Sequence, residues 1–236
     1  MPSQTRNLPL LMAVAHALGP LRDRVVFVGG ATVNLYSTVT GFTPEPRTTE
    51  HVDCIVEITP RSVVTFHQLE EEMRALGFVN DVNANFIGRW KFPTGLVVDM
   101  IPTQPDILGF SNPWYPAGFA FAVPCELPDG TSIRILSAPY FLATKLVALR
   151  SRGWEDLWTS QDLGDIVHVL DNRLDLPAEV AAADPALGVY VSEQIALLLG
   201  RPELLNVLES VLPSGSGYKR KYEKESRLQQ LLSSHA

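Results

Sequence analysis

Three side chains in two apolar segments have the types and spacing of a metal site. His51 and Asp53 lie two residues apart, where the charged stretch RTTEHVD runs into apolar sequence. Side chains alternate along an extended strand, so these two point to the same face. Asp99 interrupts a second apolar run, VVDMI, where an unpaired carboxylate would be costly to bury. If the two strands are neighbours, the three groups can hold a divalent cation for phosphoryl transfer. The alternative is that each belongs to a turn network at a strand end.

Two further features could contact phosphate. Gly29 and Gly30 follow the apolar run VVFV, and a turn without side chains lets backbone amides approach an anion. A simple tight turn explains the same pair equally well. Arg89, in GRWKF, offers a guanidinium for a phosphate, and a surface ion pair is its other interpretation.

A lysine and two aspartates occupy expected helices in the second half of the chain. Lys145 has apolar neighbours three and four residues away, and spacing alone favours a lysine whose stem is covered while its ammonium reaches water. Asp162 falls in a first helical turn, where the helix dipole accounts for it without a function. Asp165 stands deeper in the same helix, and the dipole explains it less easily.

The elements that must position these residues can be read from periodicity and turn signals. We expect a helix over residues 7–18, a strand over 25–30, a short helix over 31–36 and a strand over 52–58. Thr59 and Pro60 suit the start of a helix that ends near Gly77. Two hairpins are expected around Pro93-Thr94-Gly95 and Pro128-Asp129-Gly130.

After Ser137 the strand signal disappears. Ser137 can begin a helix over 139–152 and Ser160 one over 161–170, with two or three more helices to the end. The sequence therefore predicts an α+β fold, with an α+β core over 1–136 and a helical region over 137–236.

Composition excludes several classes of protein. The 236 residues carry a formal net charge of −7, which argues against broad nucleic-acid binding. The one basic run, 218–224, is expected to be solvated surface. No apolar run approaches the roughly 20 residues of a membrane helix, so we expect a cytoplasmic protein without a membrane partner. Cys54 and Cys125 lie in apolar runs and are expected to be buried, reduced thiols.

Several blocks, taken in order, resemble one family, the AbiEii-type nucleotidyltransferases. That family belongs to the polymerase β nucleotidyltransferase superfamily, which also contains the MenT toxins. The resemblance runs from about Phe27 to Arg173. The blocks are VGGATVNLY, RTTEHVD, RALGF, GRW, VVDMIPT, ILGFSNPWY, ILSAPYFLATKLVALRSRG and SQDLGDIVHVLDNR.

The resemblance implies a role for each matching residue. Nucleotide contacts are implied for Gly29, Gly30, Arg47, Thr49, Lys145 and Asp162, and catalytic roles for Asp53, Asp99, Lys145 and Asp165. Arg89 joins the candidate nucleotide contacts because its own guanidinium could meet a phosphate. The implied metal ligands are His51, Asp53 and Asp99, with Mg²⁺ or Mn²⁺ as cofactor. His51 departs from the family, which usually has aspartate there, and imidazole is a poor ligand for Mg²⁺.

These expectations describe a nucleotidyltransferase-like mixed sheet with flanking helices and a helical region that closes the cleft. The implied reaction transfers a nucleoside monophosphate from an NTP to RNA, protein or a small molecule. A toxin that acts on tRNA and pairs with an antitoxin protein is one form of this reading. The leading alternative is an inactive fold that only binds nucleotide or protein, and His51 is its main support.

Overall fold

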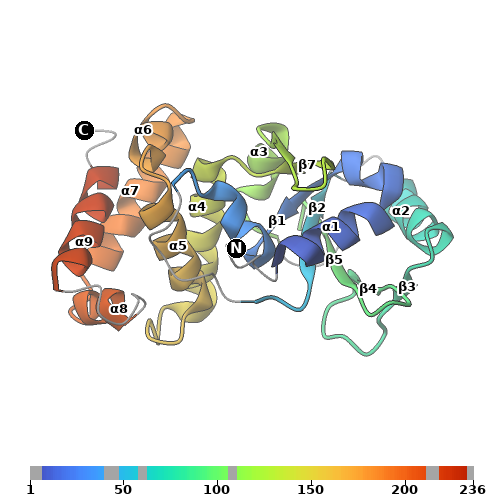
Figure 1. Ribbon diagram of the computed structural model, residues 1–236, viewed down its shortest axis with the longest axis horizontal. Helices are drawn as coiled ribbons and strands as arrows, with labels where there is room; N and C mark the ends of the chain where they lie inside the picture. Colours follow the sequence, from blue (N-terminus) through green and yellow to red (C-terminus); the bar gives the residue numbers. More distant parts are fainter. Residues whose placement is uncertain (1–6, 40–47, 58–62, 106–110, 211–217, 233–236) are drawn as a thin grey trace. The chain divides into compact units, whose positions relative to one another are not determined.

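The computed structural model describes residues 7–39, 48–57, 63–105, 111–210 and 218–232 (Figure 1). The chain divides into two units, and each is described by itself. The first comprises Met1–Thr32 with Arg47–Ser137, and the second comprises Val33–Pro46 with Ala138–Ala236. The sequence placed all of 1–136 in one region, and in the structure the described residues 33–39 group with the helical unit. Arg47 and the helix start at Thr59-Pro60 lie outside the described residues.

A mixed sheet of seven strands forms the centre of the first unit, in the order β3-β4-β5-β2-β1-β7-β6. β2 is parallel to β5 and antiparallel to β1, and β1 is parallel to β7. The described strands are β1 (Val25–Val28), β2 (Val52–Val56), β3 (Val79–Asn80), β4 (Arg89–Lys91), β5 (Val97–Pro102), β6 (Val123–Glu126) and β7 (Ser132–Ile135).

Both predicted hairpins are confirmed. β4 pairs with β5 and β6 with β7, each antiparallel. Their turns contain Gly95 at φ 92° and Gly130 at φ 82°, a left-handed conformation that favours glycine. Each turn sets which residues of its two strands face each other.

The helices of the first unit are α1 (Asn7–Ala17), α2 (Val63–Ala75) and α3 (Tyr115–Ala120), with a 3₁₀ turn over Gly19–Arg24. α1 and α3 both pack against β2. Gly77, at φ 92°, follows the end of α2 as expected. The short helix predicted over 31–36 is a 3₁₀ helix, Gly30–Tyr36, which spans the division between the units.

The second unit contains only helices in its described part, as the sequence predicted. They are α4 (Ala138–Ala148), a π-helical turn (Leu149–Gly153), α5 (Gln161–Asn172), α6 (Leu176–Ala181), α7 (Pro185–Leu199), α8 (Leu204–Ser210) and α9 (Tyr218–Leu232). α4 packs against α5, α6 and α7. The Ser160 hydroxyl accepts a hydrogen bond from the Leu163 amide at 3.3 Å, which confirms the predicted cap of α5.

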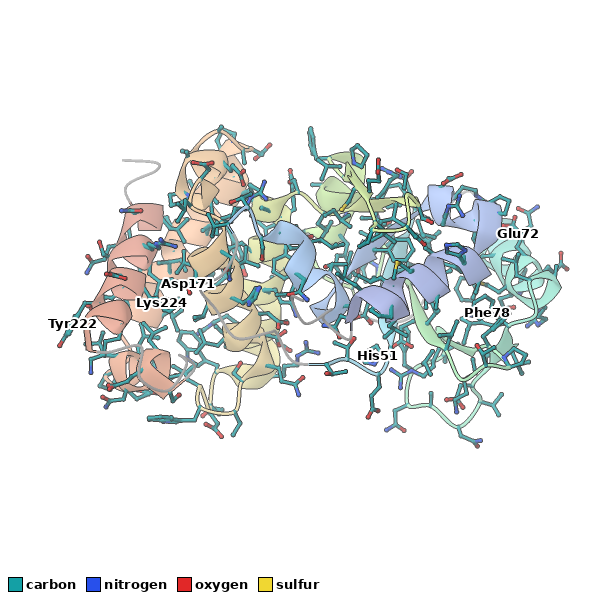
Figure 2. All side chains as sticks on the ribbon, in the orientation of Figure 1. His51, Glu72, Phe78, Asp171, Tyr222 and Lys224 are labelled. Carbon is teal, nitrogen blue, oxygen red and sulfur yellow. The ribbon has the colours of Figure 1, made fainter. Side chains whose placement is uncertain are left out.

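Two lysines of the basic run at the start of α9 are buried, although the run was expected to be solvated surface. Lys221 pairs with Glu209, and Lys224, only 1% exposed, lies 2.9 Å from Asp171 of α5 (Figure 2). Arg227 donates to the carbonyls of Leu170 and Asp171, near the end of α5. Charged side chains therefore attach α9 to the last turn of α5.

The structure bears on two expectations, one about membrane helices and one about the cysteines. Within the described residues, no helix is long and apolar enough to cross a membrane. Both cysteines are free; Cys54 is buried and Cys125 is half-buried. Burial raises the pKa of the Cys54 thiol well above its ordinary value, and the charges of Asp53 and Asp99 add to this effect. Cys54 is therefore an inert thiol rather than a nucleophile.

Candidate functional site

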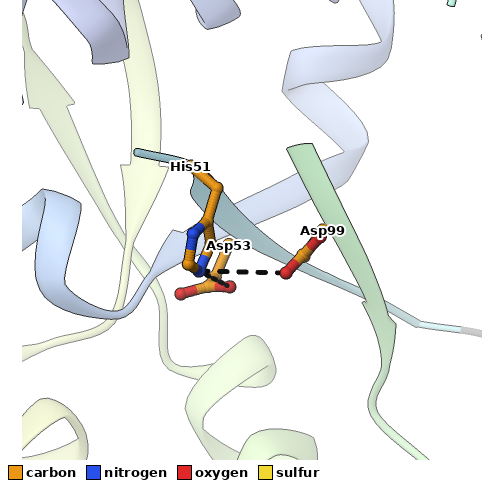
Figure 3. Close-up of side chains that lie close together, drawn as sticks. All are labelled: His51, Asp53 and Asp99. Atoms are coloured by element: carbon orange, nitrogen blue, oxygen red, sulfur yellow. Dashed lines mark ion pairs between the residues drawn. The ribbon is translucent and has the colours of Figure 1, made fainter. Parts of the chain in front are cut away.

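Asp53 and Asp99 are paired across neighbouring strands. They are direct register partners in the parallel pair β2–β5, and directly paired side chains share a face of the sheet. His51 immediately precedes β2, and its Nε2 lies 3.6 Å from Asp53 Oδ1 and 3.8 Å from Asp99 Oδ2 (Figure 3). One ligand atom from each residue lies within 4.8 Å of the others. The predicted convergence of the three residues is confirmed.

The chemistry of this donor set fits a single divalent cation. Two carboxylates and one imidazole whose ligand atoms lie within 4.8 Å of one another can bind the same ion. Carboxylate oxygens suit Mg²⁺ and Mn²⁺, whereas an imidazole nitrogen favours the softer Mn²⁺. Exposure rises from Asp99 (8%) through Asp53 (24%) to His51 (39%), so the cation would enter from the His51 side.

Arg89 lies on the other side of Asp99. It is the register partner of Asp99 across β4–β5, and its Nε and Nη2 donate to the two carboxylate oxygens at 2.7 and 2.6 Å. These hydrogen bonds raise the pKa of Arg89 above its ordinary value. Of the two interpretations left open for Arg89, the structure shows an ion pair. Its partner is one of the three candidate metal ligands.

Gly29 provides the space that the Asp53 carboxylate occupies. Val28 is the register partner of Asp53, and Gly29 follows it with φ 76°. A Cβ at Gly29 would lie 2.2 Å from Asp53 Oδ2, which no real contact allows. The Gly29 carbonyl also accepts hydrogen bonds from the Thr32 amide and hydroxyl. The glycine turn is therefore built around the candidate metal ligand.

Gly29→Ala should displace the Asp53 carboxylate as well as strain the backbone. Gly95→Ala is the matched control, since Gly95 is also left-handed but a Cβ there meets nothing within 4 Å. We expect strain of about 1–3 kcal/mol at both positions. Only Gly29→Ala should also weaken Mn²⁺ binding, measured by calorimetry beside thermal melts. Equal Mn²⁺ affinity in the two variants would contradict this account of Gly29.

Thr49 is buried and supports the segment that leads to His51. Its amide donates to Asn7 Oδ1 at 3.0 Å, and its hydroxyl donates to the His51 carbonyl at 3.1 Å. The resemblance implied a nucleotide contact for Thr49. In the structure these bonds tie the chain before β2 to α1, and they fix the backbone from which the imidazole extends.

A second group of charges lies within the helical unit. Lys145 of α4 is only 5% exposed, and its Nζ donates to Asp162 Oδ1 at 3.1 Å and Asp165 Oδ2 at 2.5 Å. Asp162 and Asp165 are also buried and lie three residues apart on one face of α5. The expectation that the Lys145 ammonium reaches water is wrong, because the packing of α4 on α5 places it between two carboxylates.

Arg152 completes this group and was not singled out from the sequence. Its Nε and Nη2 donate to both oxygens of Asp162, at 2.7 and 2.9 Å, while most of its side chain is exposed. Burial alone would raise the pKa of the Asp162 carboxyl. The hydrogen bonds and charges of Arg152 and Lys145 outweigh this and lower the pKa below its ordinary value. Arg152 lies seven residues after Lys145, which is about two helical turns, and this spacing could have indicated from the sequence that the two residues share a helix face.

Comparisons with known proteins are informative only at the level of the fold. No family model and no curated protein matches the sequence. Among solved structures, the chain is similar to an antigenic nucleotidyltransferase-like protein from Paracoccidioides brasiliensis. The match has 18% identity and a TM-score of 0.51, and it covers 97% of this chain and 94% of that one. With its mixed sheet and flanking helices, the protein therefore has a nucleotidyltransferase-like fold.

Proposed function

We propose that the protein is a metal-dependent nucleotidyltransferase that moves a nucleoside monophosphate from an NTP to an acceptor hydroxyl. One observation carries the proposal. In a fold similar to that of a nucleotidyltransferase-like protein, His51, Asp53 and Asp99 bring three ligand atoms within 4.8 Å of one another. The ordered sequence blocks that resemble AbiEii-type enzymes support the same reaction class.

In this proposal His51, Asp53 and Asp99 would hold Mg²⁺ or Mn²⁺. The bound cation would neutralise phosphate charge and the charge that develops on the leaving pyrophosphate. The acceptor oxygen forms a bond to the α-phosphorus, and the bond from that phosphorus to the bridging oxygen of the β-phosphate breaks. Pyrophosphate leaves with the electron pair.

A base must take the proton of the acceptor hydroxyl, and His51 and Asp99 are the two candidates. Both Asp99 oxygens already accept hydrogen bonds from Arg89, at 2.7 and 2.6 Å. His51 is more exposed than Asp99 and can be reached by an acceptor. An imidazole that ligates the cation through Nε2 has no lone pair left for this proton, so His51 can be the base only in a site where Asp53 and Asp99 hold the cation without it.

The nucleotide contacts are assigned from the resemblance. Gly29 and Gly30 supply backbone donors, and Lys145 and Arg47 stabilise phosphate charge. An ammonium group has three hydrogens, and Asp162 and Asp165 engage Lys145 in the structure. A phosphate contact by Lys145 therefore requires it to share or exchange one of these partners.

Product analysis tests the proposed reaction. The purified protein is incubated with each α-labelled NTP, with Mg²⁺ or Mn²⁺, and with tRNA, the protein itself or small hydroxyl compounds as acceptors. Transfer of label with release of pyrophosphate is the expected result. Labelled tRNA would favour a toxin that pairs with an antitoxin protein. No transfer to any acceptor with either metal would count against the reaction.

An inactive nucleotide- or protein-binding module is the second candidate. His51 stands where the family usually has a carboxylate, and Arg89 neutralises much of the charge on Asp99. Both features make the site less negative than one that binds two Mg²⁺ ions. NTP binding without any transfer is the outcome that would favour this candidate.

The preferred metal ion should show whether His51 binds the cation. We expect faster transfer with Mn²⁺ than with Mg²⁺, because imidazole binds the softer ion better. His51→Asp should raise the Mg²⁺-supported rate, whereas His67→Asp, at an exposed histidine of α2, should leave it unchanged. If His51→Ala transfers at the wild-type rate with Mg²⁺, His51 is not a ligand.

A further inference from the structure

The Asp99 carboxylate lies between the other two candidate metal ligands and an arginine. On one side its carboxylate contributes to the group with His51 and Asp53, where a ligand atom from each residue lies within 4.8 Å of the others. On the other side Arg89 donates to both of its oxygens, at 2.7 and 2.6 Å. A paired, planar contact of this kind is among the stronger ion pairs in proteins. It is also largely shielded from water, since Asp99 is buried.

The strand register places Arg89 directly beside Asp99. Arg89, Asp99, Asp53 and Val28 are successive register partners across β4, β5, β2 and β1. Without Arg89, two carboxylates would lie side by side in this row and would repel each other. The guanidinium therefore does for Asp99, in the metal-free protein, what a bound cation would do.

We propose that Arg89 is an internal counter-cation that competes with the divalent metal for Asp99. This inference rests on the proposed metal site, but it does not require nucleotide transfer. A metal ion that binds Asp99 must displace, or share the carboxylate with, one of the two Arg89 donors. The competition lowers metal affinity and keeps the metal-free site stable.

The Arg89 guanidinium can move away from Asp99. Its side chain is 30% exposed, so the guanidinium can turn toward water when it releases an oxygen. Asp99 cannot move as easily, because it lies in the longer β5 between β2 and β4. Metal binding is therefore expected to shift Arg89 rather than Asp99.

Mn²⁺ titration of the nucleotide-free protein, residues 1–236, tests this inference. Arg89→Gln should bind Mn²⁺ about tenfold tighter than the wild type, because a positive charge next to the ligand is removed. Lys91→Gln is the matched control. Lys91 belongs to the same strand two residues away and carries the same charge, but it pairs with Asp81 rather than Asp99. It should change the affinity by less than about twofold, because exposed and distant charges are screened.

Two further measurements keep the result interpretable if Arg89→Gln is poorly stable. Arg89→Lys keeps the charge but cannot make the paired contact, so its Mn²⁺ affinity should lie between those of the wild type and Arg89→Gln. In thermal melts with a chelator, Arg89→Gln should be less stable than the wild type. Mn²⁺ should then stabilise it by more than it stabilises the wild type.

Three results would overturn the competition. They are unchanged or weaker Mn²⁺ binding in Arg89→Gln, an equal gain in Lys91→Gln, or no Mn²⁺ binding by any form. A tighter Arg89→Gln site in a protein that transfers no nucleotide would support this inference while counting against the proposed reaction. Transfer activity together with unchanged Mn²⁺ affinity in Arg89→Gln would do the reverse.

Discussion

Asp53→Asn is expected to lower nucleotide transfer by on the order of a thousandfold, because it removes a charged ligand from the proposed cation. Metal-based charge stabilisation supplies several kcal/mol in phosphoryl transfer, which corresponds to a rate effect of this size. Asp53 is the most important of the three ligands in this account. Arg89 engages Asp99, and His51 has no charge when it acts as a metal ligand.

The same substitution should leave the fold intact. Asp53 is partly exposed, and removing its charge relieves repulsion with Asp99, so the free energy of unfolding should change by less than about 1 kcal/mol. Asp81→Asn is the matched control in the same unit, since Asp81 pairs with Lys91 and lies outside the metal site. Steady-state transfer rates and thermal melts check both variants. A rate for Asp53→Asn within tenfold of that of Asp81→Asn would contradict the role of Asp53.

Lys145→Met is expected to destabilise the protein by about 3–5 kcal/mol, because it removes one partner from a buried ion-pair group. The methionine keeps the apolar length of the side chain, but it leaves Asp165 without its ammonium contact. Asp162 loses one contact and keeps Arg152. The loss should appear as a lower denaturant midpoint. Any fall in activity must therefore be read together with the change in stability.

Two variants identify the cause of this loss. Lys91→Met removes an exposed lysine and should cost no more than about 1 kcal/mol. The double variant Lys145→Met with Asp165→Asn should recover part of the stability lost in Lys145→Met, because it also removes the buried charge that has lost its ammonium contact. If Lys145→Met is as stable as the wild type, the buried contacts have no structural role and a purely functional role for Lys145 gains support.

Local chemistry predicted much of the fold, because turns and caps are encoded within a few residues. Gly77 follows its helix, Gly95 and Gly130 lie in the turns of the two predicted hairpins, and Ser160 caps its helix. The π-helical turn over Leu149–Gly153 could not be predicted in this way. Neither could the parallel pairing of β1 with β7, which joins segments far apart in the sequence.

The sequence predicted the candidate metal ligands, but it did not predict which strands are neighbours. The alternation of His51 and Asp53 was enough to place both on one face, but their meeting with Asp99 depended on β2 and β5 being neighbours. The Arg89–Asp99 pair was missed although a signal was present. In a hairpin centred on Thr94, residues 89 and 99 are equally distant from the turn and must face each other.

The buried position of Lys145 could not be read from its own helix. Spacing within α4 predicted an apolar surround, which is correct, but not the two carboxylates that α5 brings to it. A helix face with an apolar stripe and one lysine is compatible with either a solvated or a buried ammonium. Only the packing of α5 on α4 decides between them.

Calorimetric titration of the four common NTPs is the most direct test of a metal-dependent nucleotide site at His51, Asp53 and Asp99. Wild type and Asp53→Asn are each titrated in Mg²⁺, in Mn²⁺ and in chelator. At least one NTP should bind the wild type with a divalent cation, bind much more weakly in chelator, and lose most of its metal-dependent affinity in Asp53→Asn. No binding of any NTP under any condition, or binding that is equal in chelator and in Asp53→Asn, would contradict the assignment of this site.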